Sequence, residues 1–146
     1  MRTTIYFDMD GTIANLYGVE NWLEMLINGN ATPYEIATPL VDTIALANRL
    51  NALQNKGYRL GVISWLAKGS TPEYDTKVIT AKLNWLRTHL GNVNFDTIKI
   101  VAYGTPKANY ARTENDILFD DEKANRENWC GRAYDVNNIL GVLARL

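Results

Sequence analysis

Short apolar segments typical of buried strands alternate with helical segments along almost the whole chain. The strand-like segments are rich in β-branched and aromatic residues and cover residues 3–8, 58–64, 95–102, 116–119 and 132–136. Strands that alternate with helices are typical of a parallel sheet, with right-handed crossovers that place helices on both faces. The sequence therefore predicts a three-layer α/β/α sandwich, with residues 1–146 forming a single domain.

Start and stop signals bracket the helical segments between these strands. Thr32-Pro33 and Thr38-Pro39 each place a hydroxyl residue before a proline, which favours the first turn of a helix, and a capping box at Ser70–Glu73 does the same later. In the helix that follows the box, one face is apolar and is formed by Ile79, Leu83, Leu86 and Leu90. We expect helices over 19–27, from 32 onward, over 40–56, 70–90 and 138–146, and a helical turn at 105–107.

Composition and charge exclude several classes of protein. Fifteen basic and sixteen acidic residues give a formal net charge of −1, and no basic block indicates a nucleic-acid or anionic membrane partner. No apolar run approaches the roughly 20 residues of a membrane span, and no signal peptide is evident. A single cysteine and a single histidine, Cys130 and His89, exclude an intrachain disulfide and a zinc site built on such ligands. We expect a soluble, unprocessed cytoplasmic protein, monomeric or weakly dimeric, without a membrane or stable nucleic-acid partner.

Polar residues at the ends of the predicted strands indicate where a functional site lies. In a parallel sheet, ligands bind at the carboxyl ends of the strands, near the point where the strand order reverses. The first four strands bring the following groups to that edge, in chain order: Asp8 and Asp10, then Ser64, then Lys107, then Asp120 and Asp121. Four carboxylates, one hydroxyl and one ammonium are therefore expected to converge on one crevice.

The first strand ends in two carboxylates one residue apart, followed by a glycine. The strand period of two places Asp8 and Asp10 on about the same side and Met9 on the other. Gly11 lets the backbone bend sharply and approach a ligand closely, and Thr12 can hydrogen-bond the turn or the ligand. Crowded carboxylates repel one another unless a cation intervenes, and an all-oxygen site of this kind suits Mg²⁺.

Four motifs in this order resemble those of the haloacid dehalogenase-like (HAD) superfamily: DMDGT at 8–12, VIS at 62–64, Lys107, and ILFDD at 117–121. The resemblance covers residues 3–136 and implies a HAD-like fold with a Rossmann-like parallel sheet. It also implies an Mg²⁺-dependent phosphatase that works through an aspartyl-phosphate, as most members are. On this resemblance Asp8 is the nucleophile, and Asp10 is first the general acid and then the base. Superfamily dehalogenases lack the second aspartate, so its presence favours phosphoryl transfer.

The same resemblance implies roles for the remaining residues. Ser64 would hydrogen-bond a transferring phosphoryl oxygen, and Lys107 would hold the nucleophile and the phosphate against charge repulsion. Lys99 and Lys123 compete with Lys107, which we prefer because it follows a Thr-Pro helix start and precedes Asp120 by 13 residues. The implied Mg²⁺ ligands are Asp8, the backbone carbonyl of Asp10, and Asp120 and Asp121, with no indication of which of the last two contacts the metal directly.

In this superfamily an inserted cap largely decides the substrate. Residues 15–37 leave room only for a small helical cap, so we expect an open cleft that admits a bulky phosphate ester. Segments around the mouth of this cleft carry groups that can stack a base or meet a second anion, namely Trp22, Tyr34, Trp65, Lys68 and Tyr74. For Trp22 and Tyr34 the stronger expectation is that they anchor their helices. The expected substrate is a nucleotide, and the expected substrate-binding residues are Gly11, Thr12, Trp65 and Lys68.

Other functions remain open on the sequence alone. A HAD-like domain can bind Mg²⁺ or phosphate as a non-catalytic interaction or regulatory module, although such a module would not require Asp10. A phosphatase of this kind can also act on a polynucleotide 3′-phosphate or another phosphorylated substrate. Finally, the phosphoryl group can pass to an acceptor other than water.

Overall fold

A parallel sheet of five strands, in the order β3-β2-β1-β4-β5, forms the centre of the molecule. The computed structural model describes residues 1–146. The strands are β1 (Thr4–Phe7), β2 (Arg59–Trp65), β3 (Thr97–Val101), β4 (Ile117–Phe119) and β5 (Arg132–Tyr134). Every neighbouring pair is parallel. The parallel α/β sheet predicted from the alternation of strands and helices is confirmed.

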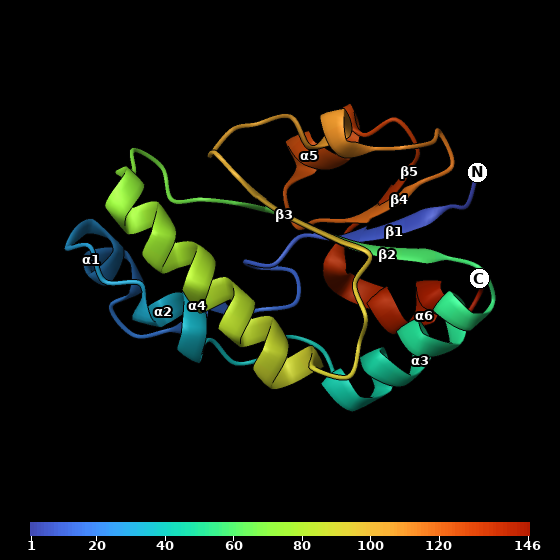
Figure 1. Ribbon diagram of the computed structural model, residues 1–146, viewed down its shortest axis with the longest axis horizontal. Coiled ribbons are helices and arrows are strands. Elements are labelled where there is room, and N and C mark those ends of the chain that lie inside the picture. Colours follow the sequence, from blue (N-terminus) through green and yellow to red (C-terminus); the bar gives the residue numbers. More distant parts are fainter.

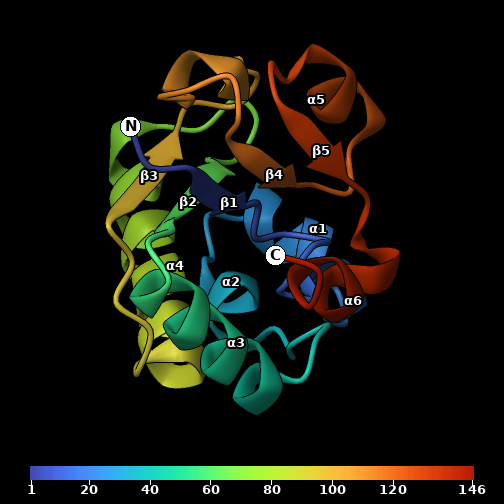
Figure 2. The same ribbon diagram turned by 90° about the vertical axis from the view of Figure 1, so that its right-hand side faces the viewer.

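Helices cover both faces of the sheet, but unequally (Figures 1 and 2). The larger layer contains α3 (Thr43–Asn55), α4 (Pro72–Leu90) and α6 (Ile139–Leu143), the last preceded by the 3-10 turn η3 (Val136–Asn138). The opposite layer contains α5 (Lys123–Asn128) and the 3-10 turn η2 (Lys107–Tyr110). The sandwich therefore has one thick and one thin helical layer.

The side chains of β1 alternate between two apolar cores. Ile5 and Phe7 belong to the main core on the side of α3, α4 and α6, whereas Tyr6 belongs to a smaller core on the other side. There the rings of Tyr6 and Trp129 meet edge to face, with centroids 5.7 Å apart. β1 is buried on both faces, as a central parallel strand is, and Asp8, the residue that follows it, is buried as well.

Residues between β1 and α3 form three short elements beside α4: η1 (Leu16–Gly18), α1 (Trp22–Ile27) and α2 (Thr32–Ile36). Leu16 and Tyr34 pack with Tyr74 and Val78 of α4 in an apolar cluster distinct from the two cores of the sheet. Figure 1 shows α1 and α2 together beside α4, away from the strands. This is the segment for which a small helical cap was expected.

Several predicted helix starts are wrong. The helix expected from residue 19 begins at Trp22, and the helix expected to begin after Thr38-Pro39 begins at Thr43. Asp42 is the N-cap of this second helix. Its side chain accepts hydrogen bonds from the backbone N–H groups of Ile44 at 3.0 Å and Ala45 at 3.1 Å. Pro39 instead pairs with Ala14 in an isolated β-bridge. The helix therefore starts after the Asp42 cap, and Thr38-Pro39 lies before it.

Other boundaries differ by smaller amounts. The N-cap of α2 is Ala31 and not Thr32. The N-cap of α4 is Thr71 and not Ser70, and its side chain accepts a hydrogen bond from Tyr74 N–H at 3.2 Å. Helix α5 was not predicted at all. It has the sequence KANREN and no buried residue, so it carries no apolar periodicity that would reveal it.

The predicted apolar face of α4 is wrong in its centre. Ile79 and Leu83 are only half-buried, whereas Val78, Lys82 and Trp85 have no exposed surface. Trp85 fits this position because its indole N–H donates to the backbone carbonyl of Ala37 at 2.7 Å. A lysine on the buried side of a helix interrupts the apolar pattern. The sequence therefore favours Ile79 and Leu83 for the buried face, one residue away from Val78 and Lys82.

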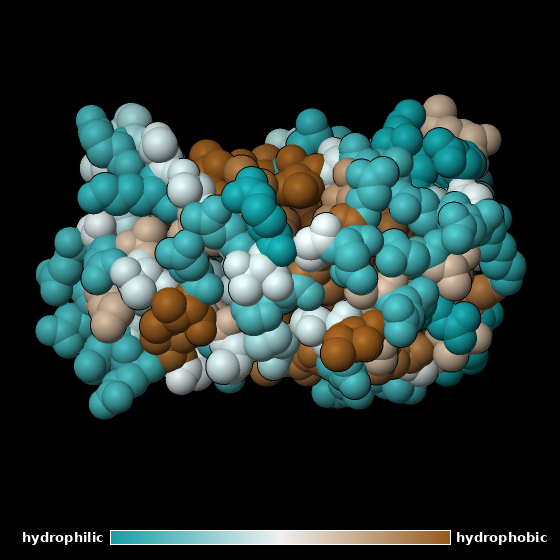
Figure 3. Space-filling model, turned by 60° about the horizontal axis from the view of Figure 1, so that its bottom comes forward, coloured by the Kyte–Doolittle hydropathy of each residue, from teal (hydrophilic) through white to brown (hydrophobic).

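The surface has no broad apolar area on the face shown in Figure 3, where apolar side chains form separate small groups among hydrophilic ones. None of the helices combines the length and the apolar composition that crossing a lipid bilayer requires. The expected monomer or weak dimer stays a prediction.

Candidate active site

A cavity of about 590 Å³ opens at the carboxyl ends of β1 and β2. Its charged wall contains Asp8, Asp10, Lys107 and Asp121. Its apolar wall comes from η1, α1 and α2, from the loop after β2 and from the first turn of α4. The predicted convergence on one crevice is seen for Asp8, Asp10, Lys107 and Asp121, whereas Ser64 and Asp120 do not line the cavity.

Asp8 follows β1 directly and is held at both carboxylate oxygens. Its backbone N–H donates to the carbonyl of Phe119 at 2.9 Å, which continues the pairing of β1 with β4 past the strand end. One carboxylate oxygen accepts a hydrogen bond from Lys107 Nζ at 2.7 Å, and the other accepts one from the Thr12 hydroxyl at 2.9 Å. Asp8 is thus a buried carboxylate with a fixed orientation at the cavity wall.

Lys107 is the lysine that reaches this site. Its Nζ lies 2.7 Å from Asp8 and 2.7 Å from Asp120, and its side chain is 2% exposed. Burial lowers the pKa of Lys107, but the charges of Asp8 and Asp120 outweigh burial and raise the pKa overall, so the ammonium stays charged. Lys99 is exposed on β3, and Lys123 pairs on the surface with Glu127 at 3.6 Å.

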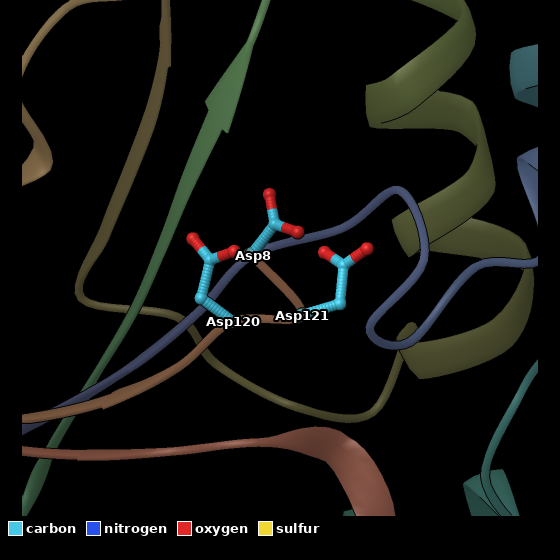
Figure 4. Close-up of side chains that lie close together, drawn as sticks. All are labelled: Asp8, Asp120 and Asp121. Carbon is cyan, nitrogen blue, oxygen red and sulfur yellow. The ribbon is translucent and has the colours of Figure 1, made fainter. Parts of the chain in front are cut away.

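Three carboxylates gather beside Lys107 (Figure 4). Asp8, Asp120 and Asp121 offer oxygens that all lie within 4.8 Å of one another, and the figure shows the three groups pointing the same way. Asp120 is fully buried and also accepts hydrogen bonds from the Glu122 N–H at 2.9 Å and the Asn125 side chain at 3.1 Å. Of the adjacent pair Asp120 and Asp121, only Asp121 lines the cavity, as Asp8 also does.

The charge of this cluster is only partly neutralised. Burial, reinforced by the charge of Asp8, raises the pKa of Asp121 to about 7, and no basic side chain pairs with Asp121. Burial and the charge of Asp8 also raise the pKa of Asp120 to about 6, although Lys107 opposes them. Carboxylate oxygens with an excess of negative charge are the donors that a hard divalent cation prefers, so the residues present fit Mg²⁺.

Gly11 and Thr12 shape this cluster and do not line the cavity. Gly11 has a φ of +79°, and a Cβ at this position would overlap the Asp121 carboxylate and the Tyr17 ring. The buried Thr12 hydroxyl donates to Asp8, and its oxygen accepts a hydrogen bond from the Asp121 N–H at 3.2 Å. The expectation that these two residues contact substrate stays a prediction.

Asp10 is held by a lysine that was not predicted, Lys82 of α4. Its Nζ donates to Asp10 Oδ2 at 2.9 Å, to Ser64 Oγ at 2.6 Å and to the Trp65 carbonyl at 2.7 Å. Lysines are common on helix surfaces, so nothing in the local sequence marks this one. The only signal is its place four residues after Val78 and three before Trp85, on what proves to be the buried face.

Ser64 contacts the same lysine as Asp10 but does not reach the cavity. Its side chain is fully buried, it accepts the hydrogen bond from Lys82, and it is absent from the cavity wall. The expected direct contact with a phosphoryl oxygen is not supported by this position. Ser64 instead anchors Lys82 to the end of β2.

Two aromatic pairs line the cavity, one from η1 and α1 and the other from the end of β2 and the loop after β3. Tyr17 and Trp22 have ring centroids 5.0 Å apart, and Trp65 and Tyr103 also have centroids 5.0 Å apart. The Trp65 indole N–H donates to the Thr105 carbonyl at 2.9 Å, which fixes the orientation of its ring. Trp65 therefore lies where a substrate-binding residue was expected, and Tyr17 and Tyr103 add aromatic walls that were not predicted.

The other aromatic and basic candidates divide between packing and the cavity. Lys68 lines the cavity, with its Nζ 5.9 Å from the centroid of the Tyr103 ring. Tyr34 and Tyr74 reach the cavity but are mainly buried, as expected for Tyr34. Trp22 is half-buried; it packs against the apolar cluster that contains Leu16 and Tyr34, and it also lines the cavity.

Comparison with known proteins identifies the fold. No protein-family model and no curated protein matches the chain. Among solved structures, the crystal structure of D,D-heptose 1,7-bisphosphate phosphatase from Burkholderia thailandensis is similar with a TM-score of 0.53 and 14% identity, over 86% of this chain and 70% of that chain. The HAD domain of the effector protein Lem4 from Legionella pneumophila matches with a TM-score of 0.48 and 12% identity, over 99% of this chain and 92% of that chain. The chain has a HAD-like fold, as its motifs implied.

Proposed function

We propose that this protein is a Mg²⁺-dependent phosphomonoesterase of the HAD type that cleaves a nucleotide through an aspartyl-phosphate on Asp8. The observation that carries the proposal is the Asp8 carboxylate, fixed at the cavity wall by Lys107 and Thr12 beside an acidic cluster, while Asp10 faces the same cavity. The similarity in fold to a bisphosphate phosphatase supports the reaction class.

The proposed reaction consists of two displacements at phosphorus. A carboxylate oxygen of Asp8 attacks, the bond from phosphorus to the ester oxygen breaks, and Asp10 donates its proton to that oxygen. Water then attacks the aspartyl-phosphate, Asp10 accepts a proton from the water, and the bond from Asp8 to phosphorus breaks. Burial raises the pKa of Asp10, although the charge of Lys82 opposes it, and a raised pKa suits a general acid.

Charge neutralisation falls to Lys107 and to the metal. The Lys107 ammonium stays beside Asp8 throughout, where it offsets the negative charge that a phosphate ester brings. Asp8, Asp120, Asp121 and the backbone carbonyl of Asp10 would hold Mg²⁺, with Asp121 as the member of the acidic pair that is open to the cavity. When bound, Mg²⁺ supplies positive charge that stabilises the transferring phosphoryl group.

Without Mg²⁺ the protein should lose thermal stability as the pH rises from about 5 to about 8. A carboxyl whose pKa is raised by folding binds more protons in the folded than in the unfolded state. The folded protein therefore loses stability over the pH range that starts at the ordinary carboxyl pKa of about 4. This range ends at the raised pKa values, about 6 for Asp120 and about 7 for Asp121. Mg²⁺ should raise the Tm more at the higher pH, because it competes with protons for the same oxygens.

Thermal unfolding in EDTA and in MgCl₂ at both pH values tests this prediction. The Asp121→Asn variant is the matched control, since it removes the one of these two carboxyls whose pKa is raised further and should flatten both the pH dependence and the Mg²⁺ shift. An equal Mg²⁺ shift at both pH values in the unmodified protein would contradict the prediction.

The aromatic walls support a nucleotide as the substrate. A planar base held between the Tyr17–Trp22 pair and the Trp65–Tyr103 pair would stack on rings that are already oriented. Lys68 lies on the same cavity and can meet a further anionic group. We propose that residues 15–37 act as a small cap on a single domain of residues 1–146, because η1, α1 and α2 supply one wall of the cavity.

Phosphate release from a panel of nucleoside monophosphates, sugar phosphates and 3′-phosphorylated oligonucleotides, with and without Mg²⁺, tests the proposed function. We expect Mg²⁺-dependent release that is fastest for nucleoside monophosphates. No release from folded protein would favour the non-catalytic binding module. Phosphate found on another acceptor would indicate transfer, and preference for the oligonucleotides would indicate a polynucleotide 3′-phosphatase.

Replacing Trp65 by alanine should raise KM for nucleotides by roughly 5- to 150-fold, the equivalent of about 1–3 kcal/mol for a stacked base. The KM for a sugar phosphate should change little, because it offers no base. The Trp65→Phe variant keeps an aromatic ring but loses the hydrogen bond to Thr105, so it separates stacking from anchoring. Equal losses on nucleotides and sugar phosphates would contradict base stacking on Trp65.

A further inference from the structure

We propose that Lys82 is a positioning residue that holds the Asp10 carboxylate in place for its two proton transfers. This inference rests on the function proposed above, in which Asp10 is the acid and then the base. It concerns a residue outside the four motifs, on a helix whose other buried residues are apolar or aromatic.

The hydrogen bonds of Lys82 are complete within the protein. An ammonium has three N–H groups, and the three acceptors around Lys82 are Asp10 Oδ2, Ser64 Oγ and the Trp65 carbonyl, all within 2.9 Å. The Lys82 side chain is 0% exposed and does not line the cavity. It therefore has no donor left for a substrate and acts through the groups that it binds.

Asp10 needs such a partner because its side chain has no other. β1 ends at Phe7, and Asp10 lies in the turn that follows, so the sheet does not restrain its side chain. The only hydrogen bond of the Asp10 carboxylate is the one from Lys82, and it engages Oδ2. Oδ1 is left free on a side chain that lines the cavity, whereas Asp8 has both oxygens engaged.

Lys82 links Asp10 to the sheet through the end of β2. Ser64 and Trp65 are the last residues of β2, where they pair with Ile100 and Val101 of β3. The Lys82 Nζ also lies 4.9 Å from the centroid of the Tyr34 ring, which connects it to α2. One oxygen of Asp10 is thereby fixed to the sheet, and the other stays free for the two proton transfers of the proposed reaction.

A lysine is a costly residue for mere packing here. A buried ammonium is stable only when its charge and its donors are satisfied, and an apolar side chain of similar length would fill the same space without that requirement. The partner of Lys82 is a carboxylate at the cavity wall. A role in the reaction therefore accounts for the free-energy cost of burying a lysine here.

The test compares two kinds of ester, p-nitrophenyl phosphate and an alkyl phosphate such as a nucleoside 5′-monophosphate or β-glycerophosphate. A nitrophenolate leaves without a proton, whereas an alkoxide needs one from Asp10. In Lys82→Met, kcat/KM for the alkyl ester should fall at least about tenfold more than kcat/KM for p-nitrophenyl phosphate. A purely structural role would lower both values by the same factor.

The Asp10→Asn background supplies the matched control. If Lys82 acts through Asp10, adding Lys82→Met to Asp10→Asn should leave the ratio of the two kcat/KM values unchanged from that of Asp10→Asn alone. Lys82→Arg, which keeps a cation and N–H donors, should recover part of the ratio. A further tenfold change in the double variant would overturn the inference.

Circular dichroism shows whether Lys82→Met folds. Should it fail to fold, Ser64→Ala takes its place, because it removes one anchor of Lys82 without touching Asp10. Its ratio should shift in the same direction by a smaller factor, and an unchanged ratio would overturn the inference. Phosphate release by the unmodified protein, with a changed ratio in Asp10→Asn but an unchanged ratio in every folded Lys82 or Ser64 variant, would overturn this inference alone. No release by the unmodified protein from either ester would overturn the proposed function and this inference with it.

Discussion

The Asp8→Asn variant is expected to lose phosphate release by at least about 10³-fold, the scale seen when a covalent nucleophile is removed. An amide occupies the same space as the carboxylate but cannot attack phosphorus. The local hydrogen bonds can persist, because the amide oxygen can still accept from Lys107 and the amide N–H₂ can donate to the Thr12 oxygen. Release of phosphate from the best ester of the panel, in the presence of Mg²⁺, measures the effect.

The same variant should be at least as stable as the unmodified protein, since it removes one negative charge from the cluster with Asp120 and Asp121. Asp116→Asn provides the matched control. Asp116 is also a buried aspartate, but it accepts hydrogen bonds from the backbone N–H groups of Thr4, Arg112 and Thr113 and lies outside the cavity wall. The Asp116→Asn variant should lose stability and keep the turnover rate of each folded molecule. Full activity in Asp8→Asn would remove Asp8 as the nucleophile.

The parts of the site that follow strand ends could be predicted from the sequence. Asp8 and the Asp120–Asp121 pair come directly after short buried strands, and in a parallel sheet neighbouring strand ends meet at one edge. Lys107 could be predicted because it begins a short helical turn on the way to β4. In each case a local pattern and the topology of the sheet are sufficient.

The parts that depend on contacts across the fold could not be predicted in this way. Lys82 meets Asp10 across 72 residues, and only the packing of α4 against the sheet brings its ammonium to that place. The burial of Ser64 has the same origin, because a helix that delivers Lys82 also covers the end of β2. Tyr17 and Tyr103 belong to connecting segments without periodicity, so their side chains could not be assigned to a wall of the cavity.

Replacing Lys107 by methionine is expected to have the largest effect on stability. Its ammonium binds Asp8 and Asp120 at 2.7 Å each, with side-chain exposures of 9% and 0% for the two partners. Removing one partner of a buried ion pair leaves charge without compensation, which costs about 3–5 kcal/mol of unfolding free energy. Activity should fall by at least about 10²-fold as well, because the nucleophile and the phosphate lose the cation between them.

Urea unfolding of Lys107→Met at two pH values separates this cause from a loss of packing. Asp120, whose pKa burial already raises, can take up a proton when its lysine is absent, so the loss of stability should be smaller at about pH 5 than at about pH 8. Mg²⁺ should restore part of the stability at the higher pH for the same reason. Lys123→Met is the matched control, since Lys123 is 80% exposed and should cost no more than about 0.5 kcal/mol. A loss of stability in Lys107→Met that ignores both pH and Mg²⁺ would mean that Lys107 matters for its methylene chain, because only a charge responds to protons and cations.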